Sequence, residues 1–268
     1  MAGEAATDFD AIPLDDRGLL LGDGLFETLL FTRGGLVLPE AHARRMAEGA
    51  AFLGLPAPTI EAFAACAQAA VVRAGLLAAR AAVRVTLTAG SGGRGLDRPA
   101  TVGARLFATA APAAIPSASA TLVIAATCRN HASPASRLKT LAYLDNVLAR
   151  REAIAAGADE AIMLNTLGEI ACAAAANLFW VTSDVLMTPA LETGRLDGVM
   201  ARQVIAAAAN LGLEVRQVRQ DPTALAAAAA LFLTNSLIGV RPAHLLDQLR
   251  PSPHPIVERL AAAVSALV

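Results

Sequence analysis

Lys139 is the single lysine of this 268-residue chain, whose 22 Lys and Arg residues are otherwise all arginines. A guanidinium is permanently protonated and a poor nucleophile, whereas a buried ammonium can lose its proton and attack a carbonyl carbon. Lys139 is therefore a candidate Schiff-base residue. The alternative interpretation is a surface lysine that has no chemical role.

Three further features suit a phosphate group. Arg45, on an expected helix, could hold a phosphate through two N–H groups. Residues 198–200 open another expected helix, where free backbone N–H groups and the helix dipole favour an anion. The turn Thr234-Asn235-Ser236 ends an apolar strand with three hydrogen-bonding side chains. Each feature alone is common, but beside a single lysine they favour pyridoxal phosphate chemistry, in which the cofactor ring is the electron sink.

Hydrophobic periodicity and turn residues predict the elements that must position these groups. Helices are expected at residues 40–54, 60–74, 143–156, 199–211 and 254–267. Strands are expected at residues 25–31, 36–38, 83–88, 105–108, 121–125, 160–164, 175–181, 185–187, 213–218 and 231–234. Strands and helices therefore mix in both halves of the chain.

A stretch rich in alanine, proline and serine lies near the middle of the chain and has the composition of a linker. We expect a smaller N-terminal α+β domain at residues 1–110, a linker at 111–120, and a larger C-terminal α/β domain at 121–268 that carries the lysine. A cleft between two such domains is the usual location of a small-molecule site.

Composition excludes several classes of function. The net charge is −1 and no run of like charges occurs, so a nucleic-acid partner has no support. The three cysteines are odd in number and far apart, which argues against a disulfide framework or a zinc site and favours a cytoplasmic location. No histidine has metal-ligand spacing, so no metal is expected. The uncharged stretch 222–240 contains polar turn residues and is expected to be buried, not to span a membrane.

The order of motifs resembles the class IV aminotransferase family, a pyridoxal-phosphate fold type. The motifs that carry the resemblance run from Asp16 to about Pro242: Asp16-Arg17-Gly18, Gly22 to Thr28, His42 with Arg45, the Lys139 segment with Asn146 to Ala149, Gly157 to Ala161, Asn177 to Trp180, Thr188-Pro189 and Gly198-Val199. The resemblance implies an α+β, two-domain fold of the D-amino acid aminotransferase type, with pyridoxal 5'-phosphate in the interdomain cleft and a homodimeric assembly.

Within this family, residues 90–95, 176–180 and 233–237 are most similar to aminodeoxychorismate lyase. That resemblance implies release of pyruvate to give 4-aminobenzoate, from an aminodeoxychorismate-like substrate. A D-amino acid or branched-chain amino acid transaminase remains the alternative, because the same lysine serves that reaction.

Carried over by position, the resemblance assigns a role to each candidate residue. Lys139 would be the catalytic amine. The cofactor would contact Arg45, Lys139, Cys172, Val199, Met200, Asn235 and Ser236. Apart from the resemblance, Arg94 is our hypothesis for a contact with a substrate carboxylate, and capping of its own loop is the alternative. Phe26 and Tyr143 are further candidate substrate contacts, and packing under a helix is the alternative for Tyr143. His42, one helical turn from Arg45, is interpreted as structural.

The sequence departs from the family at two cofactor positions. Cys172 stands where the family has a glutamate that keeps the pyridine nitrogen protonated, and a thiol is a poor counter-ion for that purpose. Glu169 lies three residues earlier, on the opposite face of a strand unless a bulge intervenes. Ala201 stands where the family has an arginine, and Arg202 follows one residue late. A catalytically impaired or non-catalytic member is therefore a second alternative.

Overall fold

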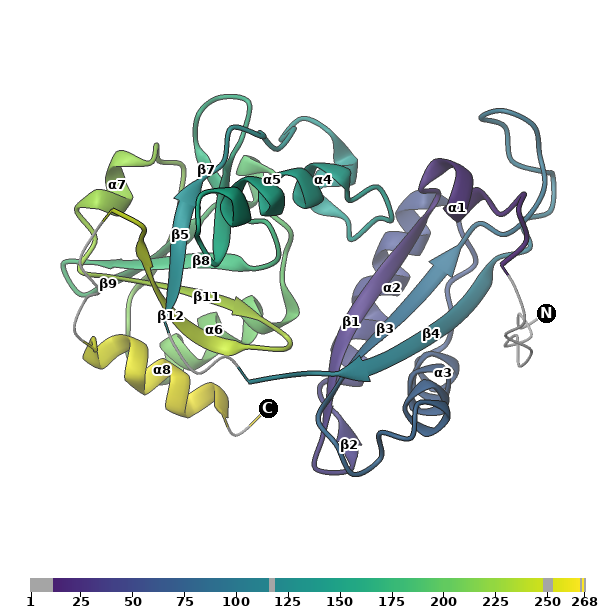
Figure 1. The fold of residues 1–268 in the computed structure, drawn as a ribbon, viewed down its shortest axis with the longest axis horizontal. Coiled ribbons are helices and arrows are strands. Elements are labelled where there is room, and N and C mark those ends of the chain that lie inside the picture. The colour runs from purple at the N-terminus through teal and green to yellow at the C-terminus, as the bar shows by residue number, and fades with distance from the viewer. Residues whose placement is uncertain (1–11, 116–118, 248–252, 266, 268) are drawn as a thin grey trace. The chain divides into compact units, whose positions relative to one another are not determined.

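The computed structural model describes residues 12–115, 119–247, 253–265 and 267, which form two compact units (Figure 1). Unit 1 comprises the described residues up to Ala114 together with Leu138–Ala142, and unit 2 comprises the others. The sequence places the lysine in the second domain, but in the structure its segment belongs to unit 1. The physical reason is strand pairing with the edge of β1, described below.

Unit 1 is a four-stranded antiparallel sheet covered on one face by helices (Figure 1). Its strands are β1 (Gly24–Thr32), β2 (Gly35–Leu36), β3 (Ala81–Thr88) and β4 (Arg105–Pro112), in the order β2-β1-β3-β4. Its helices are α1 (Arg17–Leu21), α2 (Pro39–Leu53) and α3 (Ile60–Arg73). Alternate residues of β1 pack under α2 and α3 in the core, together with side chains of β3 and both helices: Leu25, Leu29, Phe31, Met46, Phe63, Val83 and Val85.

The lysine segment completes the edge of β1 that β2 leaves unpaired. The N–H of Phe26 donates to the carbonyl of Lys139 over 2.9 Å, and the N–H of Leu141 donates to the carbonyl of Gly24 over 3.0 Å. An exposed strand edge offers unpaired N–H and C=O groups, and the segment satisfies them. A Cβ at Gly24 would lie 2.8 Å from the Leu141 side chain and 2.4 Å from a backbone oxygen of β3, so only glycine permits this approach.

Unit 2 is built on an eight-stranded mixed sheet. Its strands are β5 (Ala120–Ile124), β6 (Glu160–Leu164), β7 (Ile170–Ala173), β8 (Asn177–Thr182), β9 (Val185–Pro189), β10 (Val215–Val218), β11 (Ala230–Asn235) and β12 (Gly239–Leu245). Their order is β10-β9-β8-β11-β12-β5-β6-β7. The helices are α4 (Pro134–Arg137), α5 (Leu144–Ala155), α6 (Val199–Asn210), α7 (Thr223–Ala226) and α8 (Pro255–Ser265), with a 3-10 turn at Leu191–Thr193.

Each helix and strand predicted from the sequence is present, with ends shifted by a few residues, and the α+β fold is confirmed. The elements that the sequence does not predict are mostly short, namely α1, α4, α7, the 3-10 turn, β7 and β12. All of these except β12 span only three to five residues, too short for a periodic pattern to identify them. No helix among the described residues combines the length and the apolar composition that crossing a bilayer requires.

Candidate functional site

In unit 1, the amine of Lys139 rests against an aromatic ring. Its Nζ lies 4.2 Å from the centroid of the Phe26 ring, and the guanidinium carbon of Arg84 lies 3.6 Å from the same centroid. The two cations reach Phe26 from opposite edges of β1, Lys139 from the lysine segment and Arg84 from β3. A cation within about 6 Å of a ring centroid is attracted by the ring face. Backbone pairing and the ring therefore hold the Lys139 amine in place.

Arg45 belongs to a buried cluster that includes a carboxylate not predicted from the sequence. Its Nε donates to Oε1 of Glu27 over 2.7 Å, and its Nη2 donates to Oε2 over 2.6 Å. The Nδ1 of His42 lies 2.6 Å from the same Oε2. The side chains of Glu27 and His42 are each 1% exposed, and that of Arg45 is 11% exposed. Glu27 falls in the series Leu25, Glu27, Leu29 that faces α2, a period-two signal that could have identified it.

The charges of this cluster are set by burial and by the neighbouring groups. Burial alone would raise the pKa of Glu27, but the charge of Arg45 and hydrogen bonds from His42 and Arg45 outweigh it and lower the pKa to about 2. Burial lowers the pKa of His42, and the positive charges of Arg45 and Lys139 act in the same direction. The carboxylate is therefore ionised and the imidazole neutral near pH 7, with the Nδ1–H of His42 donating to Glu27.

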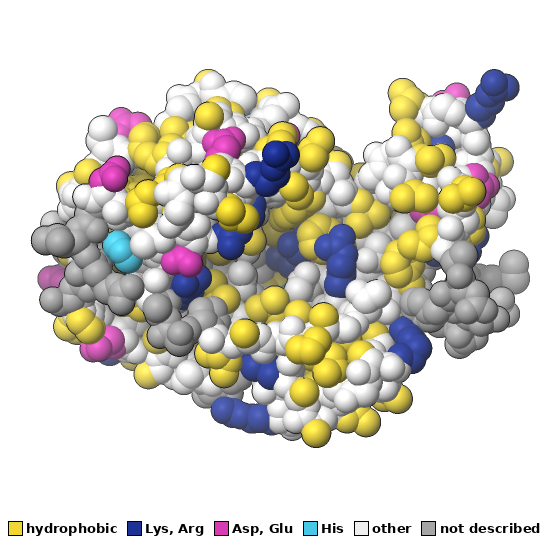
Figure 2. Space-filling view, viewed as in Figure 1, with side chains coloured by type: hydrophobic (Ala, Val, Ile, Leu, Met, Phe, Trp, Pro, Cys, Tyr) yellow, Lys and Arg dark blue, Asp and Glu magenta, His cyan; other side chains and the backbone are white. Residues whose placement is uncertain are grey.

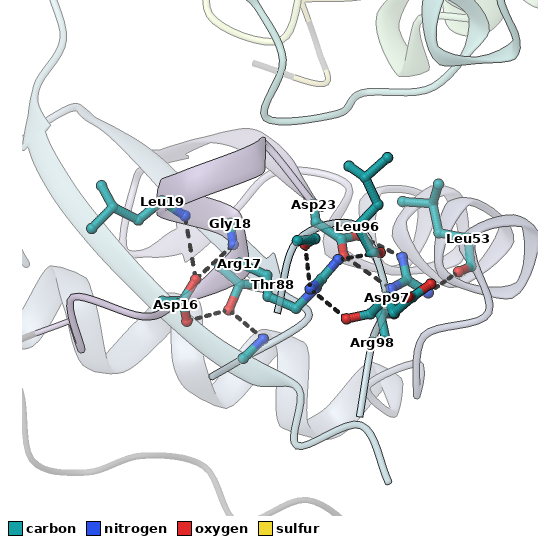
Figure 3. A network of polar contacts seen from close by, with 12 residues as sticks. Asp16, Arg17, Gly18, Leu19, Asp23, Leu53, Thr88, Leu96, Asp97 and Arg98 are labelled. Atoms are coloured by element: carbon teal, nitrogen blue, oxygen red, sulfur yellow. Dashed lines mark hydrogen bonds and ion pairs between the residues drawn. The ribbon is translucent and has the colours of Figure 1, made fainter. Parts of the chain in front are cut away.

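A polar network holds the glycine-rich loop 90–98 against residues 16–23 (Figure 3). The guanidinium of Arg17 donates to the carbonyls of Leu96 and Asp97, over 2.9 and 3.0 Å, and to the carboxylate of Asp23 over 2.9 Å. Arg98 donates to both oxygens of the same carboxylate. Arg94, predicted to contact substrate, lies exposed in this loop, and no hydrogen bond or ion pair joins it to the described residues.

In unit 2, the N-terminus of α6 has the form of an anion site. Gly198 is the residue before the helix, and among the described residues no side-chain cap bond reaches the N–H groups of the first turn, which include those of Val199 and Met200. These N–H groups have no partner within the helix, and the helix dipole makes their end positive. Val199 and Met200 are themselves buried, so their side chains pack while their backbone groups remain available.

The strand ends beside α6 add polar side chains to this site. A Cβ at Gly198 would lie 1.9 Å from Oδ1 of Asn177, which places the Asn177 amide directly against the helix start. Thr234 is the cross-strand partner of Asn177, so both side chains share a face of the sheet. Thr234 is fully buried, and its hydroxyl has no hydrogen-bond partner among the described residues. The sequence predicts the ligands one and two residues later, at Asn235 and Ser236.

The side chain of Asn235 shapes the turn instead of pointing to a ligand. Its Oδ1 accepts from the N–H groups of Leu237 and Ile238, over 2.9 and 3.0 Å, and its Nδ2 donates to the carbonyl of Ala175 over 2.9 Å. Ser236 is half-buried in the same turn. These bonds use Oδ1 and one of the two Nδ2–H donors of Asn235, and its role as a cofactor contact stays a prediction.

Cys172 is a buried thiol in β7, 4% exposed. Burial raises its pKa, with Glu160 in the same direction and Arg129 and Arg195 opposed, so the thiol is protonated near pH 7. The pairing of β6 with β7 does contain a bulge. Even so, Glu169 does not replace the missing carboxylate, because its oxygens accept hydrogen bonds from Asn165 over 2.8 Å and Arg219 over 2.9 Å.

The remaining predicted residues have structural surroundings. Tyr143 is half-buried and precedes the first turn of α5 in unit 2, whereas Lys139 lies in unit 1. Ala201 is buried within α6, and Arg202 pairs with Asp197 on the surface, with 2.8 Å between Nη2 and Oδ2. The guanidinium of Arg202 is therefore engaged by the carboxylate of Asp197.

A family model for class IV amino-transferases matches residues 24–246 of this chain. Aminodeoxychorismate lyase of Bacillus subtilis is 35% identical over 121 residues, which span 45% of this chain and 41% of that protein. A Methanocaldococcus jannaschii protein, provisionally assigned as a branched-chain-amino-acid aminotransferase, is 30% identical over 236 residues, 87% of this chain and 81% of that protein. The first of these matches thus spans less than half of the relative.

Solved structures match over nearly the whole chain. A Legionella pneumophila protein, provisionally assigned as a 4-amino-4-deoxychorismate lyase, has a TM-score of 0.90 and 27% identity, covering 100% of this chain and 99% of that one. A Mycobacterium tuberculosis protein, described as a hypothetical aminotransferase and solved in its PLP-bound form, has a TM-score of 0.83 and 23% identity over 97% of this chain and 94% of that one. The second match shows a shared fold.

Proposed function

This chain belongs to the class IV aminotransferase family, whose enzymes use pyridoxal 5'-phosphate, and we propose that it acts as an aminodeoxychorismate lyase. The observation that carries the choice of reaction is the match to the Legionella protein over the full chain, at 27% identity. The Bacillus subtilis lyase supports the same choice. Pyruvate and 4-aminobenzoate would be the products, a step that belongs to folate biosynthesis.

The residues present fit the cofactor. In unit 2, the first turn of α6 and the hydroxyl of Thr234, which has no hydrogen-bond partner among the described residues, suit a phosphate group. In unit 1, the guanidinium of Arg45 is the proposed phosphate ligand. A buried hydroxyl without a partner costs free energy, which an anionic acceptor would offset. When bound, the cofactor supplies a carbonyl carbon that a lysine amine attacks and a ring that takes up electrons.

Lys139 would do the proton chemistry. Its Nζ is the one side-chain amine of the chain, and backbone pairing together with the Phe26 ring holds it in place. In the proposed reaction Nζ accepts the proton from the α-carbon of the substrate and returns a proton to the departing pyruvate fragment. Holding the base at a fixed position before the substrate arrives lowers the entropic cost of that transfer.

Arg94 is proposed to contact a substrate carboxylate. The network of Arg17, Asp23 and Arg98 anchors the residues that follow it, so the loop is ordered before binding. The Arg94 guanidinium itself is exposed. A planar guanidinium binds a carboxylate through two parallel N–H donors. Phe26 and Tyr143 remain proposed substrate contacts.

Amino transfer is the second candidate reaction, favoured by the match to the Methanocaldococcus jannaschii protein over 87% of this chain. Measuring 4-aminobenzoate release against keto-acid-dependent amino transfer separates the two reactions. Turnover of aminodeoxychorismate without amino transfer is the expected result, whereas amino transfer without any lyase turnover would overturn the proposal.

A catalytically impaired member is the third candidate, favoured by the protonated thiol at Cys172. The visible spectrum of the purified protein tests it. We expect absorbance at about 410–430 nm, a property of the cofactor joined to a lysine. This absorbance should be lost in Lys139→Ala. A colourless protein that takes up no added cofactor would favour the impaired or binding-only interpretation.

A homodimer in the cytoplasm is also proposed. Large apolar side chains are exposed in unit 1 at Leu14, Leu19, Leu20, Leu21 and Leu96, and apolar side chains are spread over the face seen in Figure 2. A partner subunit would remove such side chains from water. Sedimentation would distinguish a dimer from a monomer.

A further inference from the structure

The ion pair between Arg45 and Glu27 has the form of a fixed support. Two guanidinium nitrogens meet two carboxylate oxygens, at 2.7 and 2.6 Å, so the plane of the guanidinium is set by the plane of the carboxylate. His42 in turn lies 2.6 Å from one of those oxygens and limits rotation of the carboxylate. Each of the two supporting side chains is 1% exposed, so packing also restricts them.

The same helix carries a comparison pair. Arg44 and Glu40 lie on the surface of α2, joined by one contact of 3.1 Å, with side chains 66% and 68% exposed. Such surface pairs contribute little to stability, because solvent screens them. The buried pair is different, because both charges have lost most of their hydration and depend on each other's hydrogen bonds for compensation.

Strand β1 links this cluster to the amine. Successive residues of a strand point to opposite faces. Phe26 contacts Lys139 on one face, and Glu27 holds Arg45 on the other. The amine and the guanidinium are therefore supported by adjacent residues of one strand.

We propose that Glu27 and His42 are positioning residues that fix the Arg45 guanidinium as an anion-binding group at a set place relative to the Lys139 amine. The inference rests on the proposed function in one respect, the assignment of Arg45 to the cofactor phosphate. Neither Glu27 nor His42 would touch the phosphate.

The charge balance makes this inference testable. Glu27 carries one negative charge that cancels the charge of Arg45, and His42 is neutral near pH 7. If charge alone attracted the phosphate, Glu27→Gln would leave Arg45 unbalanced and tighten anion binding. If orientation matters, the same variant frees the guanidinium plane and weakens binding despite the added net charge. The two roles therefore predict opposite changes in the phosphate affinity of Glu27→Gln.

The experiment measures dissociation constants of the full-length protein for inorganic phosphate and for pyridoxal 5'-phosphate, well below the melting temperature of each variant. We expect Glu27→Gln and His42→Ala to raise both dissociation constants about tenfold. This is the loss of affinity expected for one well-oriented charge-assisted hydrogen bond. His42→Asn keeps an N–H donor near the position of Nδ1 and should restore most of the affinity. Glu40→Gln, in the exposed pair, should change neither constant.

The control Leu29→Ala distinguishes a positioning role of Glu27 and His42 from a purely structural one. It removes a buried side chain from the same face of β1. We expect Leu29→Ala to lower the melting temperature and leave phosphate affinity unchanged. Unchanged or tighter phosphate binding in Glu27→Gln would overturn the inference, as would wild-type protein that binds neither ligand. If Glu27→Gln does not fold, the phosphate affinity of Glu27→Asp decides instead. The shorter aspartate side chain cannot reach both Nε and Nη2 of Arg45.

Failure of the proposed function gives a different pattern. Without it, the wild-type protein shows no visible absorbance that depends on Lys139. The dissociation constants of Glu27→Gln and Arg45→Lys for inorganic phosphate still decide the inference. Inorganic phosphate does not react with an amine, so its binding does not depend on the chemistry of Lys139.

Discussion

The backbone N–H of Phe26 donates to the carbonyl of Lys139, and the ring of Phe26 lies 4.2 Å from the amine of the same lysine. One residue of β1 thus fixes both ends of the lysine. The main-chain bond fixes the backbone of Lys139, and the ring face fixes the position of its Nζ. A lysine side chain otherwise has four rotatable bonds and a correspondingly large entropy to lose when it is ordered.

Replacing the ring tests this arrangement. Phe26→Leu keeps most of the buried volume but removes the ring face, so we expect a stability loss below about 1.5 kcal/mol. Under the proposed function, the rate constant of the chemical step should fall about tenfold, because a cation–ring attraction of about 1–2 kcal/mol no longer holds the amine in place. Urea denaturation and single-turnover kinetics measure the two effects. Phe63→Leu, on the buried face of α3, should lose stability without loss of rate.

Removing the carboxylate of Asp23 should open the glycine-rich loop. Asp23→Asn leaves the guanidinium groups of Arg17 and Arg98 without their shared counter-ion. We expect a loss of about 2–4 kcal/mol in unfolding free energy, as for other partly buried ion pairs that lose one partner. Hydrogen exchange of the amides at residues 95–98 should speed up. Glu214→Gln, which breaks a surface pair with Arg216, should leave both quantities unchanged.

Local sequence patterns predict the long elements and the chemical residues that lie on them. Residue type and helix signals single out Lys139, Arg45 and the start of α6 as candidates, and their roles stay predictions. The pairing of residues 139–141 with β1 is not predictable, because it joins segments more than a hundred positions apart in the chain and depends on which strand edge is free. The assignment of the lysine to the wrong domain follows from that limit.

Buried polar partners are also hard to predict. Glu27 reads as part of a turn-and-strand motif, and only its register with Leu25 and Leu29 indicates that it faces α2. Its bonds to Arg45 then depend on the packing of α2 over β1, which a Cβ at Gly49, 2.9 Å from the Leu25 side chain, would disturb. In the sequence Thr234 is only one residue of a polar turn. That its hydroxyl finds no hydrogen-bond partner among the described residues is a property of the folded strand.

The thiol of Cys172 should be unreactive in the folded protein. Burial raises its pKa, and the thiolate is the reactive form. Cys128 is exposed, so a thiol reagent should modify Cys128 first and reach Cys172 only after unfolding, as mass spectrometry of the modified peptides would show. Rapid modification of Cys172 in native protein would contradict this prediction.

Under the proposed function, Cys172→Glu should increase turnover. An unchanged spectrum and an unchanged rate would argue against a position of residue 172 beside the ring nitrogen of the cofactor.

Acid should destabilise unit 1 through Glu27. Its pKa is about 2 in the folded protein against 4.5 ordinarily, so its contribution to stability is complete above pH 4.5 and is lost as pH falls toward 2. That loss is roughly 3 kcal/mol. His42 acts with the same sign at higher pH, because its lowered pKa lets the unfolded chain bind a proton first below pH 6.5. Urea midpoints measured from pH 7 to pH 3 for wild type and Glu27→Gln isolate the contribution of Glu27.

Adding a methyl group at Gly198 should damage the α6 site. The new Cβ would lie 1.9 Å from Oδ1 of Asn177, which must then move away from the helix start. The Asn177 amide also donates to the carbonyl of Leu196 over 2.8 Å, so this displacement breaks a second contact. We expect Gly198→Ala to cost about 1–3 kcal/mol of stability, as overpacking does. Affinity for inorganic phosphate should fall as well.

Combining the change with Asn177→Ala distinguishes the clash from a direct effect on the helix. If the clash is the cause, the double variant Gly198→Ala with Asn177→Ala should recover phosphate affinity relative to Gly198→Ala, with a coupling free energy above about 0.5 kcal/mol. Simple additivity would place the effect in the helix backbone instead. Gly103→Ala is the matched control, because a Cβ at Gly103 would meet nothing within 4 Å.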